Sequence, residues 1–315
     1  MESNKTRKSE SMVEKSLRFA AIDVGSNAVR LLLSRVFEDG HRTFYKKESL
    51  IRIPIRLGDD AFIKNHISDI KVEKLMKTMR GFKYLLEAYQ PIDYLACATS
   101  AMREADNGSK IAEMIRNQSG IDLRIVDGKT EAEIIFANHI ETILTSSDSY
   151  LYIDVGGGSC ELTIISQNQK NISASFRIGA VRLLEGLVQK SEWKEMKKWI
   201  KNLSQTSKPV SAIGSGGNIN KIFRLSGQKE GKLVSLKKLS KICQQLQSYT
   251  YEDRIKILDL RPDRADVIVP ACQIYLNVMK WAEIGNIFVP EVGLADGLIH
   301  ILYEKYKGAQ KDGNA

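Results

Sequence analysis

The sequence predicts an α/β protein made of two related domains that face one phosphate site. Residues 18–27 and 150–159 each contain an apolar run, an aspartate and a glycine turn with small hydroxyl residues. A second apolar run follows each turn, at 29–36 and 162–165, so each copy predicts a strand, a tight turn and a returning strand. A chain of 315 residues has room for about two domains.

The remaining elements alternate between strands and amphipathic helices, as in α/β domains. In the first half we expect strands at 18–23, 29–37, 42–49, 94–98 and 122–126, and helices at 70–88, 109–118 and 131–145. In the second half we expect strands at 150–154, 171–177, 209–213 and 286–289 besides the returning strand of the hairpin. Helices are expected near 180–204 and at 218–225, 235–260, 264–281 and 295–306.

These elements predict domain I at 17–137 and domain II at 138–307, although helix 295–306 could also pack back on domain I. The polar segments 1–16 and 308–315 are expected to be disordered arms. The start of the chain has no apolar segment typical of a secretion signal, and no run reaches the ~18 apolar residues of a membrane span. Because the four cysteines are far apart, they predict neither a zinc site nor a disulfide framework, which favours a cytoplasmic location.

The charge is uneven along the chain. The net charge is +9, and residues 190–241 contain 13 Lys/Arg against 3 Asp/Glu. This segment is either a solvated helical face or a surface that attracts a polyanion. No RNA-recognition, helix-turn-helix or zinc-finger signature is present, so a specific nucleic-acid partner is not expected.

The glycine turns are candidate anion sites, because glycine lets backbone N–H groups approach an oxyanion closely. Neither hairpin turn has a Walker or dinucleotide-binding pattern, and two ordinary β-turns are the alternative. Asp154 and Glu161 bracket the second turn and could place two carboxylates near one cation. A third cluster, at 214–217, turns from a strand into a helix and either binds an anion or allows close packing.

Residues 124–133 predict a strand end, an Asp-Gly turn and a helix. Thr130 and Glu133 fit a capping box, which leaves Glu131 at the first helical position. Glu131 could accept a proton from water in a cleft, or it could simply be a favourable charge at a helix start. Arg103 follows another strand and either clamps a phosphate or lies exposed on a helix.

Six motifs, in this order from about Phe19 to Tyr303, resemble the exopolyphosphatase/guanosine pentaphosphate phosphohydrolase family: Ala-Ile-Asp-Val-Gly-Ser-Asn, Ala-Thr-Ser-Ala-Met-Arg-Glu-Ala, Asp-Gly-x-x-Glu-Ala, Asp-Val-Gly-Gly-Gly-Ser-x-Glu-Leu, Ile-Gly-Ala-Val-Arg-Leu and Gly-Ser-Gly-Gly-Asn. The resemblance implies a short member of the actin/sugar-kinase/Hsp70 superfamily, with two ribonuclease-H-like domains around a central cleft. It also implies a homodimer.

The resemblance assigns Glu131 as the base that activates water, and Asp154 and Glu161 as positions linked to Mg²⁺, with Mn²⁺ as a second possibility. The predicted phosphate-binding residues are Asp23, Gly25, Ser26, Asn27, Arg103, Gly156, Gly157, Gly158, Ser159, Gly214, Ser215 and Gly216. Three positions depart from the family pattern: Thr130 replaces a common Glu, Glu133 a common Arg, and Cys160 a common Thr.

The predicted function is therefore an exopolyphosphatase that releases terminal orthophosphate from inorganic polyphosphate by metal-assisted attack of water. In this hypothesis the basic segment 190–241 holds the rest of the polyanion. Hydrolysis of guanosine pentaphosphate at its 5′-phosphate is the nearest alternative. A sugar or acid kinase of the same superfamily and a non-catalytic polyphosphate or nucleotide binder are the other classes.

Overall fold

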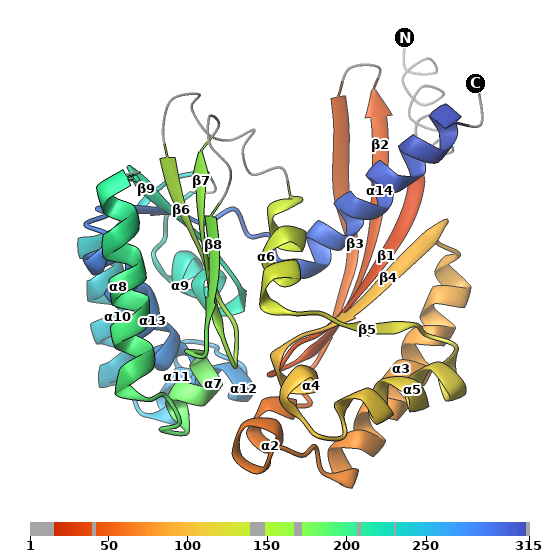
Figure 1. Ribbon diagram of the computed structural model, residues 1–315, viewed down its shortest axis with the longest axis horizontal. Helices are drawn as coiled ribbons and strands as arrows, with labels where there is room; N and C mark the ends of the chain where they lie inside the picture. The colour runs from red at the N-terminus through yellow and green to blue at the C-terminus, as the bar shows by residue number, and fades with distance from the viewer. Residues whose placement is uncertain are drawn as a thin grey trace.

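The structure is a computed structural model that describes residues 16–39, 42–138, 149–166, 172–206, 209–229 and 231–312. It contains two mixed sheets, each with helices packed on it (Figure 1). The predicted α/β class is confirmed. We call residues 16–138 the first lobe and residues 149–289 the second lobe.

The first sheet has the strand order β3-β2-β1-β4-β5. Its antiparallel strands are β1 (Leu17–Val24), β2 (Val29–Asp39) and β3 (Arg42–Ile53), while β4 (Asp93–Ala98) and β5 (Leu123–Ile125) continue parallel to β1. The helices of this lobe are α2 (Leu57–Lys64), α3 (Asp69–Tyr89), α4 (Ser100–Glu104), α5 (Gly108–Ser119) and α6 (Gly128–Phe136).

The second sheet has the order β10-β11-β9-β6-β7-β8. Its strands are β6 (Ser149–Val155), β7 (Cys160–Ser166), β8 (Ile172–Phe176), β9 (Ser211–Ser215), β10 (Val234–Ser235) and β11 (Asn286–Phe288). Its helices are α7 (Ala180–Leu184), α8 (Lys190–Thr206), α9 (Gly217–Leu225), α10 (Leu236–Ser248), α11 (Tyr251–Lys256), α12 (Pro262–Ala265) and α13 (Ile268–Trp281). Each lobe thus contains a hairpin, β1–β2 in the first and β6–β7 in the second. The first strand of each hairpin also pairs with a parallel strand, β4 or β9.

The last helix, α14 (Leu294–Asp312), crosses back over the first sheet (Figure 1). Alternate β1 residues face opposite sides: Ile22 belongs to the core that includes α3, whereas Phe19 packs in the cluster that contains Leu298 and Leu302 of α14. With both faces covered, the middle of β1, residues 19–22, is a continuous apolar run rather than an alternating one. The division of the chain at residue 137 stays a prediction.

Several boundaries differ from the predictions. No element was predicted at α2, α4 or β10, which have 8, 5 and 2 residues. Segments this short show too few turns or alternations for a periodic pattern. The expected disordered tail at 308–315 is wrong as far as Asp312, because α14 continues to that residue. The predicted arm up to residue 15, the last three residues of the chain and the end of the predicted helix 131–145 lie outside the described residues.

Helices α6 and α14 approach each other backbone to backbone at Gly297. A Cβ atom on Gly297 would lie 1.9 Å from the carbonyl oxygen of Ile134. Gly308 lies on the same helix, and a Cβ there would meet nothing described within 4 Å.

We therefore expect Gly297→Ala to lower the free energy of unfolding by about 1–3 kcal/mol, because a rigid backbone must move. Gly308→Ala is the matched control and should raise that free energy by roughly 0.5–1 kcal/mol, since alanine favours a helix. Urea unfolding of both variants measures the difference. Equal stability of the two variants would contradict the close contact.

Candidate active site

The two hairpins have the same register but different charges. In the first, Asp23 pairs across the strands with Arg30, and the two side chains form an ion pair. In the second, the equivalent pair is Asp154 and Glu161. Residues directly opposite each other point to the same face of a sheet. Two residues seven positions apart therefore form a cross-strand pair in each hairpin. The opposite charges of the pair cancel in the first lobe, whereas both residues of the pair are acidic in the second lobe.

Glu131 from the first lobe joins this acidic pair. The carboxylate oxygens of Glu131, Asp154 and Glu161 lie within 4.8 Å of one another. Burial, and then the charges of Glu161 and Asp154, raise the pKa of Glu131 well above its usual range. Burial, and then Asp154, raise the pKa of Glu161 to about 7. Two buried carboxylates and the half-buried Asp154, at this separation, need a cation or protons to coexist.

The position of Glu131 does not come from the predicted capping box. Helix α6 begins at Gly128, and its N-cap is Asp127, whose carboxylate accepts a hydrogen bond from the Thr130 N–H at 2.7 Å. The capping box was wrong because an aspartate earlier in the chain satisfies the same N–H group. Glu131 therefore lies one turn inside the helix, where it is 7% exposed.

Serine hydroxyls hold the acidic pair in place. Ser215 donates to Asp154 at 2.5 Å, and Ser175 donates to Glu161 Oε1 at 2.9 Å. A hydrogen bond with Ser159 also acts on Glu161 and lowers its pKa. Ser159 and Ser215 were predicted to contact phosphate, but these hydroxyls are engaged with carboxylates.

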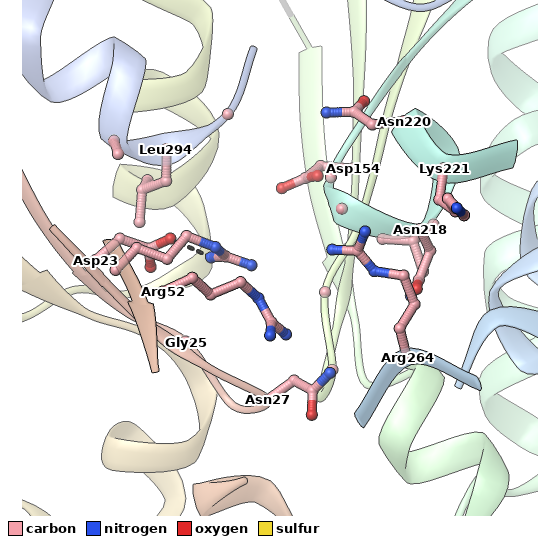
Figure 2. A pocket seen from close by; sticks show the side chains of 18 of the residues that line it. Asp23, Gly25, Asn27, Arg52, Asp154, Asn218, Asn220, Lys221, Arg264 and Leu294 are labelled. Carbon is pink, nitrogen blue, oxygen red and sulfur yellow. Dashed lines mark hydrogen bonds and ion pairs between the residues drawn. The ribbon is translucent and has the colours of Figure 1, made fainter. Parts of the chain in front are cut away.

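The acidic cluster lies at a cleft of about 450 Å³ between the lobes, lined by both hairpin turns. Arginine side chains reach into it from both sides, and Figure 2 shows Arg52 and Arg264 pointing toward each other across the opening. Seven Lys and Arg residues line the cleft: Arg30, Lys47, Arg52, Lys221, Arg224, Arg261 and Arg264. This set gives the cleft a cationic wall beside its acidic end.

This cationic lining was not predicted from the sequence. Arg30 could have been found, since it is opposite Asp23 once the turn of the hairpin is fixed. Arg52 and Arg264 lie on β3 and α12, in segments without a recognisable motif. Segment 190–241 was predicted to hold the rest of the polyanion; among its described basic residues, Lys221 and Arg224 line the cleft, and the role of the others stays a prediction. Helix α8, with its exposed lysines, covers the outer side of the second lobe (Figure 1).

The glycines of the two turns contribute mainly to turn geometry and packing. The N–H groups of Gly25 and Gly156 donate within their own turns, to Ala28 O at 3.1 Å and Ser159 O at 3.0 Å. A Cβ atom on Gly157 would lie 2.8 Å from Ser26 Cβ, so the two turns touch across the cleft. Both turns still line the cleft.

Four further predicted phosphate contacts have other partners. A Cβ on Gly158 would lie 2.2 Å from the Phe62 ring, and a Cβ on Gly214 would lie 2.8 Å from Ile287. Gly214 therefore serves strand packing, the alternative noted above, whereas Gly216 at the start of α9 lines the cleft. Ser26 shares a hydrogen bond with Ser100, 2.9 Å between the two Oγ atoms. Asn27 lines the cleft and donates to the carbonyl of Asp263, at 2.7 Å.

Arg103 lies beside the candidate base and not in the cleft lining. Its Nη1 donates to the carbonyl of Val126 at 2.6 Å and is 3.8 Å from Glu131 Oε2. Its charge lowers the pKa of Glu131. These contacts position Glu131, and no contact that the structure describes marks Arg103 as a phosphate clamp.

Comparisons with known proteins agree with this geometry. A family model described as the Ppx/GppA phosphatase family matches residues 49–305. The chain belongs to the Ppx/GppA phosphatase family. Membership confirms the predicted resemblance and, with it, the prediction of an enzyme of the phosphatase class.

Relatives of this Ppx/GppA protein match nearly its whole length. Exopolyphosphatase 1 of Mycobacterium leprae is 23% identical over 303 residues, covering 90% of this chain and 88% of the relative. The crystal structure of an exopolyphosphatase from Cytophaga hutchinsonii has a TM-score of 0.79 at 23% identity, covering 91% and 98%. The Aquifex aeolicus family member has a TM-score of 0.74 at 23% identity, covering 92% and 99%. These likenesses confirm the fold of two ribonuclease-H-like, actin-like domains.

The carboxylate cluster fits a divalent cation. Oε2 of Glu131 and Oε2 of Glu161 are buried and accept no hydrogen bond from the described residues. Carboxylate oxygens are the ligands that Mg²⁺ prefers in proteins. The cation remains to be identified.

None of the described helices has the length and apolar character to cross a membrane.

The raised pKa values predict how the metal-free Ppx/GppA protein responds to pH. A carboxyl group whose pKa is higher in the folded state stabilises the fold at low pH and loses this contribution as pH rises. For Glu161, whose usual value is 4.5, the loss runs up to about pH 7. In EDTA, the protein should therefore unfold at a lower temperature at pH 8 than at pH 5. The corresponding loss in the free energy of unfolding is on the order of 2 kcal/mol.

Added Mg²⁺ should restore the unfolding temperature at pH 8, and Glu161→Gln should weaken both the pH effect and the Mg²⁺ effect. A metal-free unfolding temperature that is the same at pH 5 and pH 8 would contradict the buried acidic cluster.

Proposed function

We propose that this protein hydrolyses the terminal phosphoanhydride bond of inorganic polyphosphate and releases orthophosphate, with Mg²⁺ or Mn²⁺ as cofactor. The observation that carries the proposal is the division of charge in one cleft. A cluster of three carboxylates, of which Glu131 and Glu161 are buried, lies at the cleft, and arginines and lysines from both lobes also line it. Membership of the Ppx/GppA family and the names of the relatives support this substrate class.

The cationic lining suits a linear polyanion. Several of its charges already have acidic partners: Arg224 pairs with Glu291 at 2.8 Å and Lys47 with Asp296 at 2.8 Å. Each of these ion pairs partly neutralises the positive charge of the cleft. A phosphate chain can compete with the carboxylate for the exposed cation of the pair. Arginine suits this task because its planar donors match phosphate oxygens.

Asp154 and Glu161 would hold the cation, oriented by the hydroxyls of Ser215 and Ser175. When bound, a divalent cation neutralises charge on the phosphoryl oxygens as a Lewis acid. Its positive charge also favours the ionised form of the neighbouring carboxylates, which counters the raised pKa of Glu131.

Glu131 is the proposed general base. Its unpartnered Oε2 accepts the proton of a water molecule, and the water oxygen forms a bond to the terminal phosphorus. The bond between that phosphorus and the bridging oxygen breaks, and its electron pair leaves with the shortened chain. The products are orthophosphate, the shortened polyphosphate and a protonated Glu131, which returns its proton to solvent.

The cofactor identity, a cytoplasmic location and a homodimer remain part of the proposal. All four cysteines are free thiols and buried, which supports a reducing compartment. Sedimentation of the purified chain tests the dimer.

Glu131→Gln should lower kcat for phosphate release by about 10²-fold or more, because the amide cannot accept the proton of water. Glu133→Gln is the matched control, since its side chain is 66% exposed on the same helix. Phosphate release from polyphosphate with Mg²⁺ measures both. Turnover by Glu131→Gln close to that of the unaltered protein would refute the role of this residue.

Polyphosphate and guanosine pentaphosphate should be compared side by side through kcat/KM. We expect the higher value for polyphosphate, and we expect KM for long chains to rise with ionic strength because screening weakens a many-charge contact. A higher kcat/KM for the nucleotide would instead make the protein a guanosine pentaphosphate phosphohydrolase. Tight binding of either ligand with no phosphate released in Mg²⁺ or Mn²⁺ would make it a non-catalytic binder.

A further inference from the structure

Arg52 on β3 has two buried donors with no acceptor in the described part of the chain. Its side chain is 8% exposed, and one nitrogen, Nη2, pairs with Asp263 of α12. The other two, Nε and Nη1, are buried and form no hydrogen bond with any described group. Leaving such donors unpaired costs free energy. Because the guanidinium group points into the cleft in Figure 2, a ligand in the cleft can supply the missing acceptors.

The surroundings of Arg52 indicate an anionic acceptor. Arg264 reaches toward it from the second lobe (Figure 2). Burial, and then the charges of Arg52 and Arg30, lower the pKa of Arg264 to about 10. Burial lowers the pKa of Arg52 as well, and Arg30 and Arg261 add to that effect. The guanidinium groups of Arg30, Arg52 and Arg264 thus repel one another at this point, although Asp23 pairs with Arg30 and Asp263 with Arg52. An anion between them would relieve that repulsion.

This cationic point lies beyond the reacting end of the cleft. Asp23, Arg30 and Arg52 stand directly opposite one another on the neighbouring strands β1, β2 and β3. Arg30 therefore lies between Asp23 and Arg52 on one face of the first sheet, and the charge of Asp23 acts in turn on Asp154 of the acidic cluster. A phosphate group held by Arg52 is not the group that reacts at the carboxylates.

We propose that Arg52 is a specificity-determining residue that binds a second phosphate group of a linear phosphate chain, through Nε and Nη1. This inference rests on the proposed function for the orientation of the chain, with its terminal phosphate at the carboxylates. The link to Asp263 holds the guanidinium group across the two lobes and leaves the other two nitrogens free. The contact favours substrates with several linked phosphates over orthophosphate esters.

Binding of tripolyphosphate to the full chain in EDTA tests the contact without any turnover. Isothermal titration should show Arg52→Met binding roughly 10- to 100-fold more weakly, the effect of losing charge-assisted hydrogen bonds. Arg52→Lys keeps the charge and loses the planar fork, so an intermediate loss is expected. Lys46→Met removes a charge from an exposed position on the same strand, and its affinity should stay within about 2-fold because solvent screens that charge.

The double variant Arg52→Met/Asp263→Asn guards against misfolding, since it leaves no buried carboxylate without its partner. It should fold, and it should show the same loss of tripolyphosphate affinity. If Arg52→Met, Arg52→Lys and the double variant all bind within about 2-fold of the unaltered protein, the proposed contact is wrong. The proposal is also wrong if the unaltered protein fails to bind tripolyphosphate without metal.

Kinetics with Mg²⁺ separate this inference from the proposed function. Arg52→Met should raise KM for tripolyphosphate by about 10-fold or more and change kcat much less, since Arg52 does not touch the reacting phosphate. Tight binding by the unaltered protein without phosphate release would overturn the proposed hydrolysis and leave the Arg52 contact standing. Normal hydrolysis with an unchanged KM in Arg52→Met would overturn the Arg52 contact alone.

Discussion

The register of the two hairpins is the constraint from which the site follows. Each hairpin turns over the same number of residues, so the residue seven positions after the aspartate always lies directly across from it. In the first lobe that residue is Arg30, which neutralises Asp23. In the second lobe it is Glu161, which doubles the negative charge of Asp154. One change of charge between the two hairpins therefore gives a neutral pair in the first lobe and an acidic pair in the second.

The buried acidic pair then imposes conditions on its neighbours. Two carboxylates without a counter-charge are costly to bury, and Glu131 adds a third from the facing lobe. Three hydroxyls and the nearby Arg103 offset only part of that cost, because the pKa values of Glu131 and Glu161 remain raised. A site that is incomplete in this way is suited to a cation. The cationic wall of the cleft serves the opposite need, since its excess donors suit an anion.

The sequence allowed prediction of what is local and repeated. The hairpins, the acidic pair and Glu131 each lie next to a strand end that the apolar pattern marks. The helix cap at Asp127 was missed because two capping schemes were compatible with the same residues. Arg52 and Arg264 could not be found, because only the packing of the lobes brings β3 and α12 together. The exposed lysines of α8 lie outside the cleft lining, and a count of charges along the sequence could not show that position.

The second turn also packs against the first lobe. Arg182 donates from Nε to the Gly158 carbonyl at 3.0 Å, lies 4.3 Å from the centroid of the Phe62 ring, and pairs with Glu104 at 2.7 Å. Both Phe62 and Glu104 belong to the first lobe, so this arginine fastens the second turn to the opposite lobe. Gly158 is three residues from Glu161, and the same contact therefore fixes how closely Glu161 can approach Glu131. Glycine is needed there because a side chain would hold the lobes apart, and with them the carboxylates of Glu131 and Glu161.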